Sequence, residues 1–343
     1  MRGWRGPLAL SLACAFAIPA MAATKPQAAT APSASKIAAA RSQALASFQS
    51  DLVNVLSPSG DAERLLAAAL LARPLPDQSK VNSFHALVER AARADDAGPA
   101  QNWARLADCD PKNSSCPNAD ALAQLLQQAP DNAAVWLLKL SQDVNNLKSQ
   151  DARQDLAKAA SAKLYDDYSG IGLKALANAV SLLPPPNATI DPNSAAGANG
   201  VQLLIAFGSA QGMPQPALRD TATFCEKNAP TDDSVKADCL TLGKTLEWGS
   251  SPLARSLGLH LREVLNPDAA QQQDAKTARR NLVWQVQNFA ELALRAQNDK
   301  GQAQHLLALA RNGGTQMSLV LAALRDDGIP TDAPASTQAG KTD

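Results

Sequence analysis

Apolar residues recur every three or four positions along most of the chain, and this spacing places them on one face of an α-helix. Segments rich in Pro, Gly, Asn, Asp and Ser separate the periodic stretches, and these residues are typical of turns. Asp61 directly precedes the second stretch, so we expect it to cap a helix there. The pattern predicts one helix that ends near Ala107 and others at residues 35–56, 61–72, 78–95, 118–129, 133–147, 151–163, 167–183, 201–212, 215–227, 232–247, 252–265, 267–297, 301–311 and 315–326.

The composition also favours an all-α fold. Ala and Leu dominate the chain, and both form helices readily because they lose little side-chain entropy there. Aromatic residues make up only 4% of the chain, whereas strands prefer aromatic and β-branched residues. We therefore expect antiparallel helical hairpins, arranged either as an irregular α-solenoid or as two helical lobes. Neighbouring hairpins would stack because one hairpin cannot bury its apolar face alone.

A run of three prolines indicates the main internal boundary, because consecutive prolines cannot continue a helix. The run opens a segment rich in Pro, Gly and Asn at residues 184–200, which we interpret as a linker. It would join an N-terminal helical lobe at 35–183 to a C-terminal lobe at 201–327. Residues 23–34 are small and polar, which is typical of a flexible lead-in, and the polar residues 328–343 predict a disordered tail.

The first 22 residues have the pattern of a secretory signal peptide. Arg2 and Arg5 precede a short apolar run, and a small-x-small sequence ends at Ala22. The apolar run is too short to span a membrane, so we expect no transmembrane segment once the leader is removed. Cys14 would be the anchor of a lipoprotein, but its surroundings lack the usual placement of leucine three residues earlier. The sequence thus predicts an exported protein, located in the periplasm.

Four cysteines follow the leader as two close pairs, Cys109 with Cys116 and Cys225 with Cys239. Turn-forming residues lie between the members of each pair, so a disulfide in each would close the base of a helical hairpin. Closed loops of these lengths would stabilise the fold by ~2–3 kcal/mol each. A metal site or a redox pair is the alternative, but both usually require CxxC spacing, which is absent.

The stretch from Ala119 to Leu140 reads ADALAQLLQQAPDNAAVWLLKL. A helix that ends in Pro, an Asp-Asn that opens the next helix, and a Trp at position 136 resemble the junction between two tetratricopeptide-type repeats. The Gly and Tyr that usually follow the Trp are missing, and no regular 34-residue period continues the pattern. The resemblance covers this stretch alone. It implies an array of helical hairpins and, as in that family, a groove that binds protein.

Charge argues against a nucleic-acid partner. Removal of the leader takes away two arginines, so 30 basic residues remain against 32 acidic ones. Such a balance provides no electrostatic attraction to nucleic acid or to anionic membranes. We expect the partner, if it is a macromolecule, to be another envelope protein.

No catalytic signature is present, and we predict no catalytic, metal-binding or cofactor-binding residues. Asp166 or Asp167, within the sequence Tyr-Asp-Asp-Tyr, is expected to cap the helix that follows. His260 fits a hydrogen-bonded histidine on a helix. The four tryptophans after the leader are expected to be core anchors, at positions 103, 136, 248 and 284.

These observations lead to a non-enzymatic binding or scaffold protein of the cell envelope as the first hypothesis. One alternative is an enzyme whose site is assembled from dispersed residues around His260 and the 231–247 helix. The other is a purely structural envelope protein. A closed cavity with carboxylates and a histidine would favour the enzyme. A groove lined by several successive hairpins would favour the binding protein.

Overall fold

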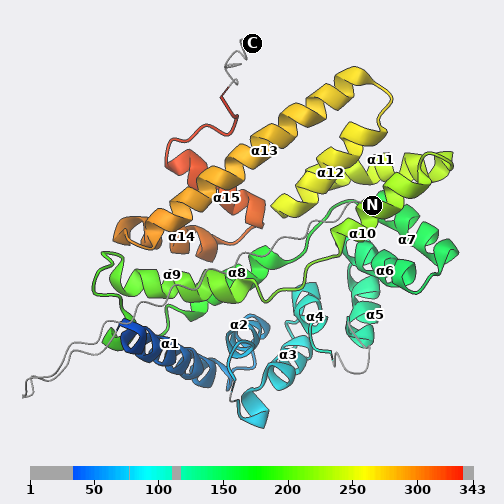
Figure 1. Cartoon of the computed structure of the whole chain (residues 1–343). Coiled ribbons are helices and arrows are strands. Elements are labelled where there is room, and N and C mark those ends of the chain that lie inside the picture. The colour runs from blue at the N-terminus through cyan, green and yellow to red at the C-terminus, as the bar shows by residue number, and fades with distance from the viewer. Residues whose placement is uncertain (1–33, 77, 110–116, 335–343) are drawn as a thin grey trace, which may run out of the picture.

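A computed structural model describes residues 34–76, 78–109 and 117–334 (Figure 1). This part of the chain forms helices and contains no strand, so the all-α prediction is confirmed. Two short 3-10 helices, η1 (Lys80–Asn82) and η3 (Asn187–Thr189), accompany fifteen α-helices. These are α1 (Ala34–Leu56), α2 (Ala62–Ala72), α3 (Phe84–Ala92), α4 (Pro99–Arg105), α5 (Ala119–Gln128), α6 (Ala133–Asn145), α7 (Ser149–Ser161), α8 (Ser169–Ala179), α9 (Gly197–Ala210), α10 (Leu218–Asn228), α11 (Asp233–Glu247), α12 (Pro252–Leu265), α13 (Ala269–Ala296), α14 (Lys300–Asn312) and α15 (Gln316–Asp326).

Local side-chain caps set many of the helix starts. Asp61 accepts a hydrogen bond from the N–H of Arg64, as expected for the cap of α2. Five further helices begin after an Asp or Asn whose side chain accepts a first-turn N–H, namely Asn118, Asn132, Asp232, Asp268 and Asp299. Each cap satisfies a backbone donor that has no partner within its own helix.

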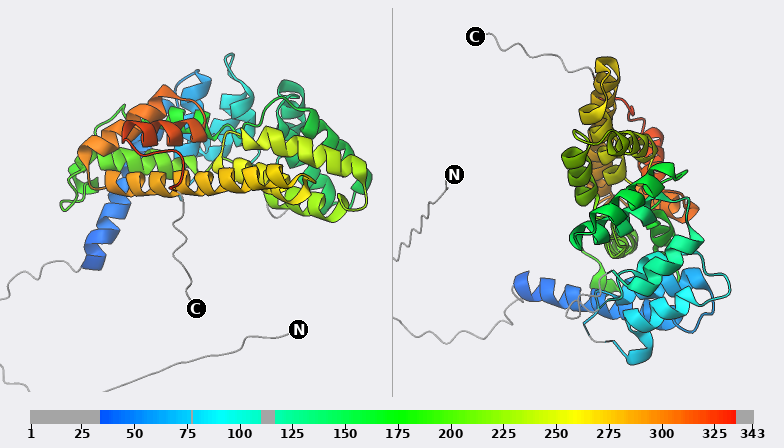
Figure 2. Two further views of the ribbon diagram at one scale, coloured as in Figure 1. Left: turned by 90° about the horizontal axis from the view of Figure 1, so that it is seen from above. Right: turned by 90° about the vertical axis from the view of Figure 1, so that its right-hand side faces the viewer.

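Consecutive helices pack as hairpins, but helices distant in sequence also meet. Helix α8 packs against α2, α9 and α14, and α7 packs against α11. In Figure 1, α8 and α9 cross the middle of the molecule, between α1 and α2 on one side and α13 and α14 on the other. Figure 2 shows that the N-terminal part of α1 projects from the body. These contacts go beyond the neighbour-to-neighbour packing of a solenoid, and that arrangement is not confirmed.

The expected linker connects helices that share one core. A continuous cluster of buried apolar side chains extends from Phe48 to Leu324 and includes residues from both sides of 184–200. The linker itself contains η3, which packs against α1, and Asp191 forms an ion pair with Arg41 at 2.6 Å. Helix α8 already ends at Ala179, before the prolines, and the buried apolar cluster continues on both sides of the segment.

One of the two predicted disulfides is observed. Cys225 on α10 is bonded to Cys239 on α11, both side chains are buried, and their Cα atoms lie 5.9 Å apart. This bridge joins the two helices of a hairpin, as predicted. The other pair includes Cys116, which lies outside the described residues, so the bond between Cys109 and Cys116 stays a prediction.

The stretch 119–140 comprises the whole of α5, a turn and the start of α6, so a helix ends before Pro130 as the pattern indicates. Helix α5 ends before Pro130, and α6 begins after Asn132. Trp136 donates a hydrogen bond from its indole N–H to the carbonyl of Pro130 at 2.7 Å. The ammonium group of Lys158 on α7 lies 6.0 Å from the Trp136 ring centroid. The tryptophan thus ties the α5–α6 turn to the neighbouring helix.

The start of the predicted tail is ordered against the body. Residues 328–334 follow α15 and lie along α13, where the side chains of Asn281, Trp284 and Gln285 bind them. Ile329 also packs against the core. The polar composition did not predict this contact because the hydrogen bonds are made by residues about fifty positions away. The predicted signal peptide at 1–22, the expected lead-in up to residue 33 and residues 335–343 lie outside the described residues.

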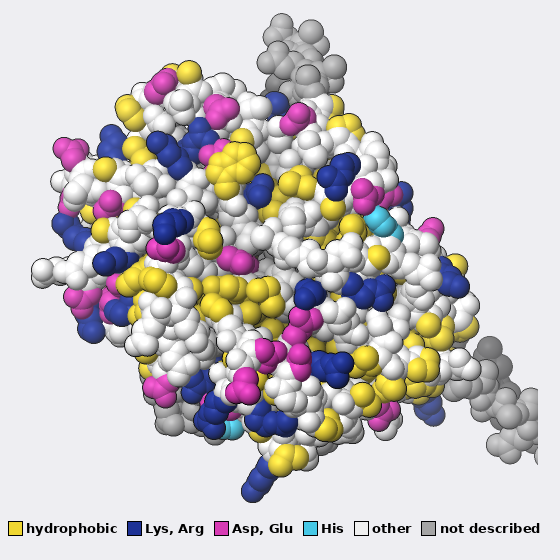
Figure 3. All heavy atoms as spheres, turned by 180° about the vertical axis from the view of Figure 1, so that it is seen from behind, with side chains coloured by type: hydrophobic (Ala, Val, Ile, Leu, Met, Phe, Trp, Pro, Cys, Tyr) yellow, Lys and Arg dark blue, Asp and Glu magenta, His cyan; other side chains and the backbone are white. Residues whose placement is uncertain are grey.

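None of the described helices combines the length and the hydropathy that crossing a membrane requires. On the face in Figure 3, basic and acidic side chains are interspersed around a central hollow lined by hydrophobic side chains.

Candidate functional site: a groove beside helix α13

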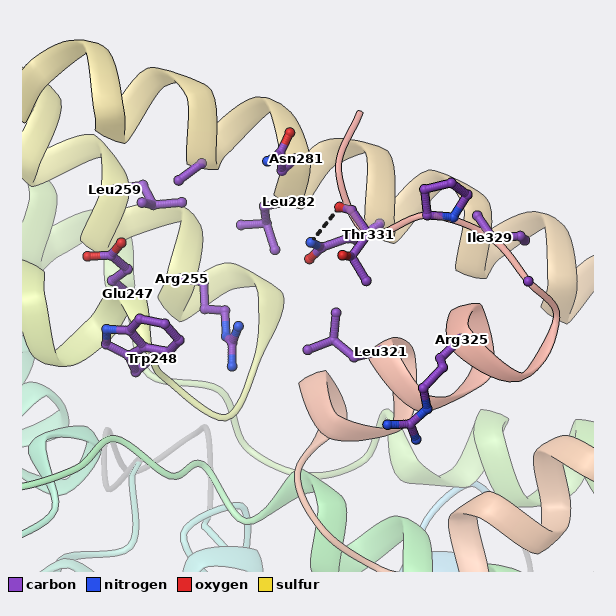
Figure 4. Close-up of a pocket in the computed structure, with 14 residues that line it drawn as sticks. Glu247, Trp248, Arg255, Leu259, Asn281, Leu282, Leu321, Arg325, Ile329 and Thr331 are labelled. Carbon is purple, nitrogen blue, oxygen red and sulfur yellow. Dashed lines mark hydrogen bonds between the residues drawn. The ribbon is translucent and has the colours of Figure 1, made fainter. Parts of the chain in front are cut away.

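A cavity of about 740 Å³ lies among the end of α11, helices α12, α13 and α15, and residues 328–331 (Figure 4). We call it the α13 groove. Four further cavities measure between 130 and 330 Å³. Leu259, Leu282 and Leu321 form apolar walls, and Trp248, Arg255 and Arg325 contribute polar or aromatic groups. The volume is within the usual range for small-molecule sites, which is about 300–1,000 Å³.

Close packing of α11 and α12 positions one side of the groove. A Cβ atom added to Gly258 would lie 2.4 Å from the backbone nitrogen of Glu247 and 2.6 Å from the carbonyl oxygen of Gly243. Only glycine allows the two helices to approach this closely. The approach places the end of α11, which carries Trp248, beside the first turn of α12, which carries Arg255.

An ion-pair network joins the same helices to α13. Arg262 on α12 is buried and pairs with Glu247 at 2.5 Å and with Asp274 at 2.9 Å. It also donates a hydrogen bond to Gln271. Glu247 is the one carboxylate among the residues that line the groove, and its charge is already compensated by Arg262.

Arg255 is a positively charged residue of the groove that has no such ion-pair partner among the described residues. Its Nε donates a hydrogen bond to the carbonyl oxygen of Gly249 at 2.9 Å, which anchors the side chain to the α11–α12 turn. No carboxylate of the described residues lies within ion-pair distance of it. Burial lowers the pKa of Arg255, and the charge of the more distant Glu247 partly opposes this effect. A guanidinium group nevertheless stays charged near neutral pH, so Arg255 is a half-buried positive charge.

Trp248 contradicts the expectation that every tryptophan is a core anchor. Its side chain is 77% exposed, whereas Trp103 is fully buried. Figure 4 shows Trp248 next to Arg255 at one side of the groove, with Leu321 and Arg325 across from them. The sequence did contain a signal for this exposure. Trp248 lies outside the apolar stripe of α11, which includes Cys239, Leu242 and Leu246, and it immediately precedes a turn.

The C-terminal segment forms a further wall. Trp284 donates a hydrogen bond to the carbonyl of Pro330 at 2.8 Å, and Gln285 donates one to the carbonyl of Thr331 at 2.9 Å. The side chain of Asn281 bonds to both Asp332 and the N–H of Ala333. These amide and indole groups are therefore occupied by the protein's own C-terminal segment.

The histidines do not lie in the α13 groove. His260 pairs with Glu226 on α10 at 2.6 Å, which fits the prediction of a hydrogen-bonded helical histidine. His85 pairs with Asp108, and His305 lies 3.4 Å from Asp326. In the described part of the chain, no three His, Cys, Asp or Glu side chains are arranged to hold a metal ion.

The Tyr-Asp-Asp-Tyr sequence at residues 165–168 is largely buried and connects the start of α8 to the α11–α12 turn. Tyr168, in the left-handed region with φ of 54°, precedes α8, and the Asp167 carboxylate accepts hydrogen bonds from Ser169. Asp167 also bonds to Ser250 in the α11–α12 turn. The N-cap position of α8 is Tyr168, whose side chain makes no capping hydrogen bond, so neither aspartate takes the cap position that the sequence predicted. Asp167, one residue earlier, accepts from Ser169 and connects the start of α8 to the turn that follows Trp248.

Comparison with known proteins adds no relative. No family model, curated protein or solved structure matches this chain.

Proposed function

We propose that the chain is a non-enzymatic binding protein of the cell envelope and that the α13 groove is its binding site. The observation that carries this proposal is the chemistry of the groove. It combines apolar walls, an exposed tryptophan and an uncompensated arginine, and its one carboxylate is held by Arg262. General acid–base catalysis needs a group able to transfer a proton near neutral pH, and the described residues of the groove lining include no histidine or free carboxylate.

Its position in the fold supports the same proposal. The groove is built by the successive helices α11, α12 and α13 together with α15, so several hairpins contribute side chains to one concavity. An exposed aromatic ring beside a cation is typical of recognition surfaces because both give contact area and orientation. The signal-peptide pattern and the buried Cys225–Cys239 bridge support export to an oxidising compartment.

The test replaces Trp248 by the photoreactive residue p-benzoylphenylalanine in the full chain, expressed in cells. The matched control carries the same residue at Val81, which is 69% exposed on η1 and far along the chain from the groove. After irradiation, intact-mass spectrometry of the purified protein detects adducts of any size. We expect a defined adduct from position 248 that position 81 does not give. Equal labelling at both positions, with the disulfide intact and the protein folded, would contradict the proposal.

A further inference from the structure

The groups that remain free in the α13 groove define a ligand class. We propose that the groove binds a small organic anion with a planar apolar body, its negative group at Arg255 and its ring against Trp248. This inference rests on the proposed function and names the ligand of the same site.

The charges of the groove favour an anionic ligand. Arg255 is half-buried and has no acidic partner within ion-pair distance in the described part of the chain, although arginines in such positions are usually paired. Arg325, across the groove, has only its exposed neighbour Asp326 at 3.6 Å. Glu247 is engaged by Arg262. The groove therefore carries net positive charge, and a bound anion would give Arg255 the partner that the fold does not provide.

The apolar walls and the tryptophan describe the rest of the ligand. Leu259, Leu282 and Leu321 surround the centre of the cavity, and the Arg255 side chain extends from α12 into the space between Trp248 and Leu321 (Figure 4). A flat ring can contact the exposed face of an indole while its charged group meets the adjacent guanidinium. An aliphatic chain would gain the apolar contact but would make less use of the planar indole.

The hydrogen-bonding groups of α13 argue against an extended peptide. Asn281, Trp284 and Gln285 are the groups on this wall that bind polypeptide backbone, and residues 330–333 already engage all three. The charged group that remains free in the described lining is a guanidinium, set among apolar surfaces. This combination recognises an anion with an apolar body and offers little to the regularly spaced amides of a peptide.

The experiment is isothermal calorimetry with the folded mature chain and three probes. Naphthalene carboxylate has the proposed chemistry, its neutral carboxamide has the same ring without the charge, and decanoate has the charge on a flexible chain. We expect saturable one-site binding of naphthalene carboxylate and weaker binding of both other probes. Absence of naphthalene carboxylate binding, or equal or tighter binding of the carboxamide or of decanoate, would overturn the inference.

Variants locate the site. Arg255→Gln should weaken binding by about tenfold or more, which corresponds to the loss of one charge-assisted hydrogen bond. Arg325→Gln should cause a smaller loss, and its 76% exposed side chain makes it a variant that leaves the fold intact. Arg219→Gln on α10, also exposed, is the matched control and should leave affinity unchanged. Affinity that both groove variants leave intact would refute the assignment.

Different results would contradict the groove as a binding site and the small organic anion as its ligand. An adduct of protein size at position 248, without binding of naphthalene carboxylate, leaves the groove as a binding site and overturns the small-anion inference. If neither an adduct nor binding is observed, both proposals fall.

Discussion

Replacement of Asp155 by asparagine is expected to remove a loss of stability that the protein undergoes between about pH 4 and pH 7. Asp155 on α7 is buried beside Asp143 on α6, and Lys139 approaches both carboxylates. Burial and the hydrogen bond with Asp143 raise the pKa of Asp155 to about 7, although the charge of Lys139 opposes this shift. Asp155 is thus protonated in the folded protein at pH values where it is ionised in the unfolded chain.

The direction and the size of the change in unfolding free energy with pH follow from this difference in protonation. Between the unfolded pKa near 4 and the folded pKa near 7, the folded state holds one proton more than the unfolded state, so stability falls as the pH rises. Above pH 7 the loss is complete, and three pKa units correspond to at most ~4 kcal/mol. Asp143 does not contribute in this window. Burial opposes its ionisation, but its hydrogen bond with Lys139 prevails and lowers the pKa of Asp143.

The assay is urea unfolding followed by circular dichroism at pH 5, 6, 7 and 8. The free energy of unfolding of the Asp155→Asn variant should be closest to that of the wild type at pH 5 and should exceed it increasingly toward pH 8. The reason is that the amide still offers a hydrogen-bond donor to Asp143 but cannot ionise. Glu291→Gln, an exposed change on α13, is the control and should follow the wild-type pH profile because its charge does not act on Asp155. Parallel curves for wild type and Asp155→Asn across this range would refute the reasoning.

Three further changes test the packing around the α13 groove, each measured by urea unfolding. Replacing Cys225 and Cys239 by alanine should cost about 3 kcal/mol, the loop entropy of a fifteen-residue closure, and reduction of the wild type should cost more because it also opens the predicted Cys109–Cys116 bond. Gly258→Ala should destabilise by about 3 kcal/mol because its Cβ would overlap the backbone of α11, whereas Gly208→Ala, which meets open space, should be neutral or slightly stabilising. Arg262→Met should cost about 3 kcal/mol because a partly buried carboxylate loses its partner, and a neutral result would show that solvent compensates that charge.

Local features of the sequence were sufficient for much of the secondary structure. The expected helix at 252–265 has the observed bounds of α12, and the expected stop near Ala72 is the end of α2. Helical periodicity, capping by Asp or Asn and interruption by Pro act within about four residues, so the sequence alone reports them. The pairing of Cys225 with Cys239 was predictable for the same reason, since it closes the turn between consecutive helices.

The groove was decided by tertiary packing. Its walls come from Trp248, Arg255 and Leu282, from α15, and from residues 328–331, which meet only after α11 to α15 have packed. The approach permitted by Gly258 places Trp248 beside Arg255, and contacts with α13 hold a C-terminal segment whose composition predicts disorder. Periodicity tells which face of a helix is apolar, but not which other face will cover it. That choice depends on shape and charge across long sequence separations, and for this reason the sequence defined the helices while the folded chain determined the site.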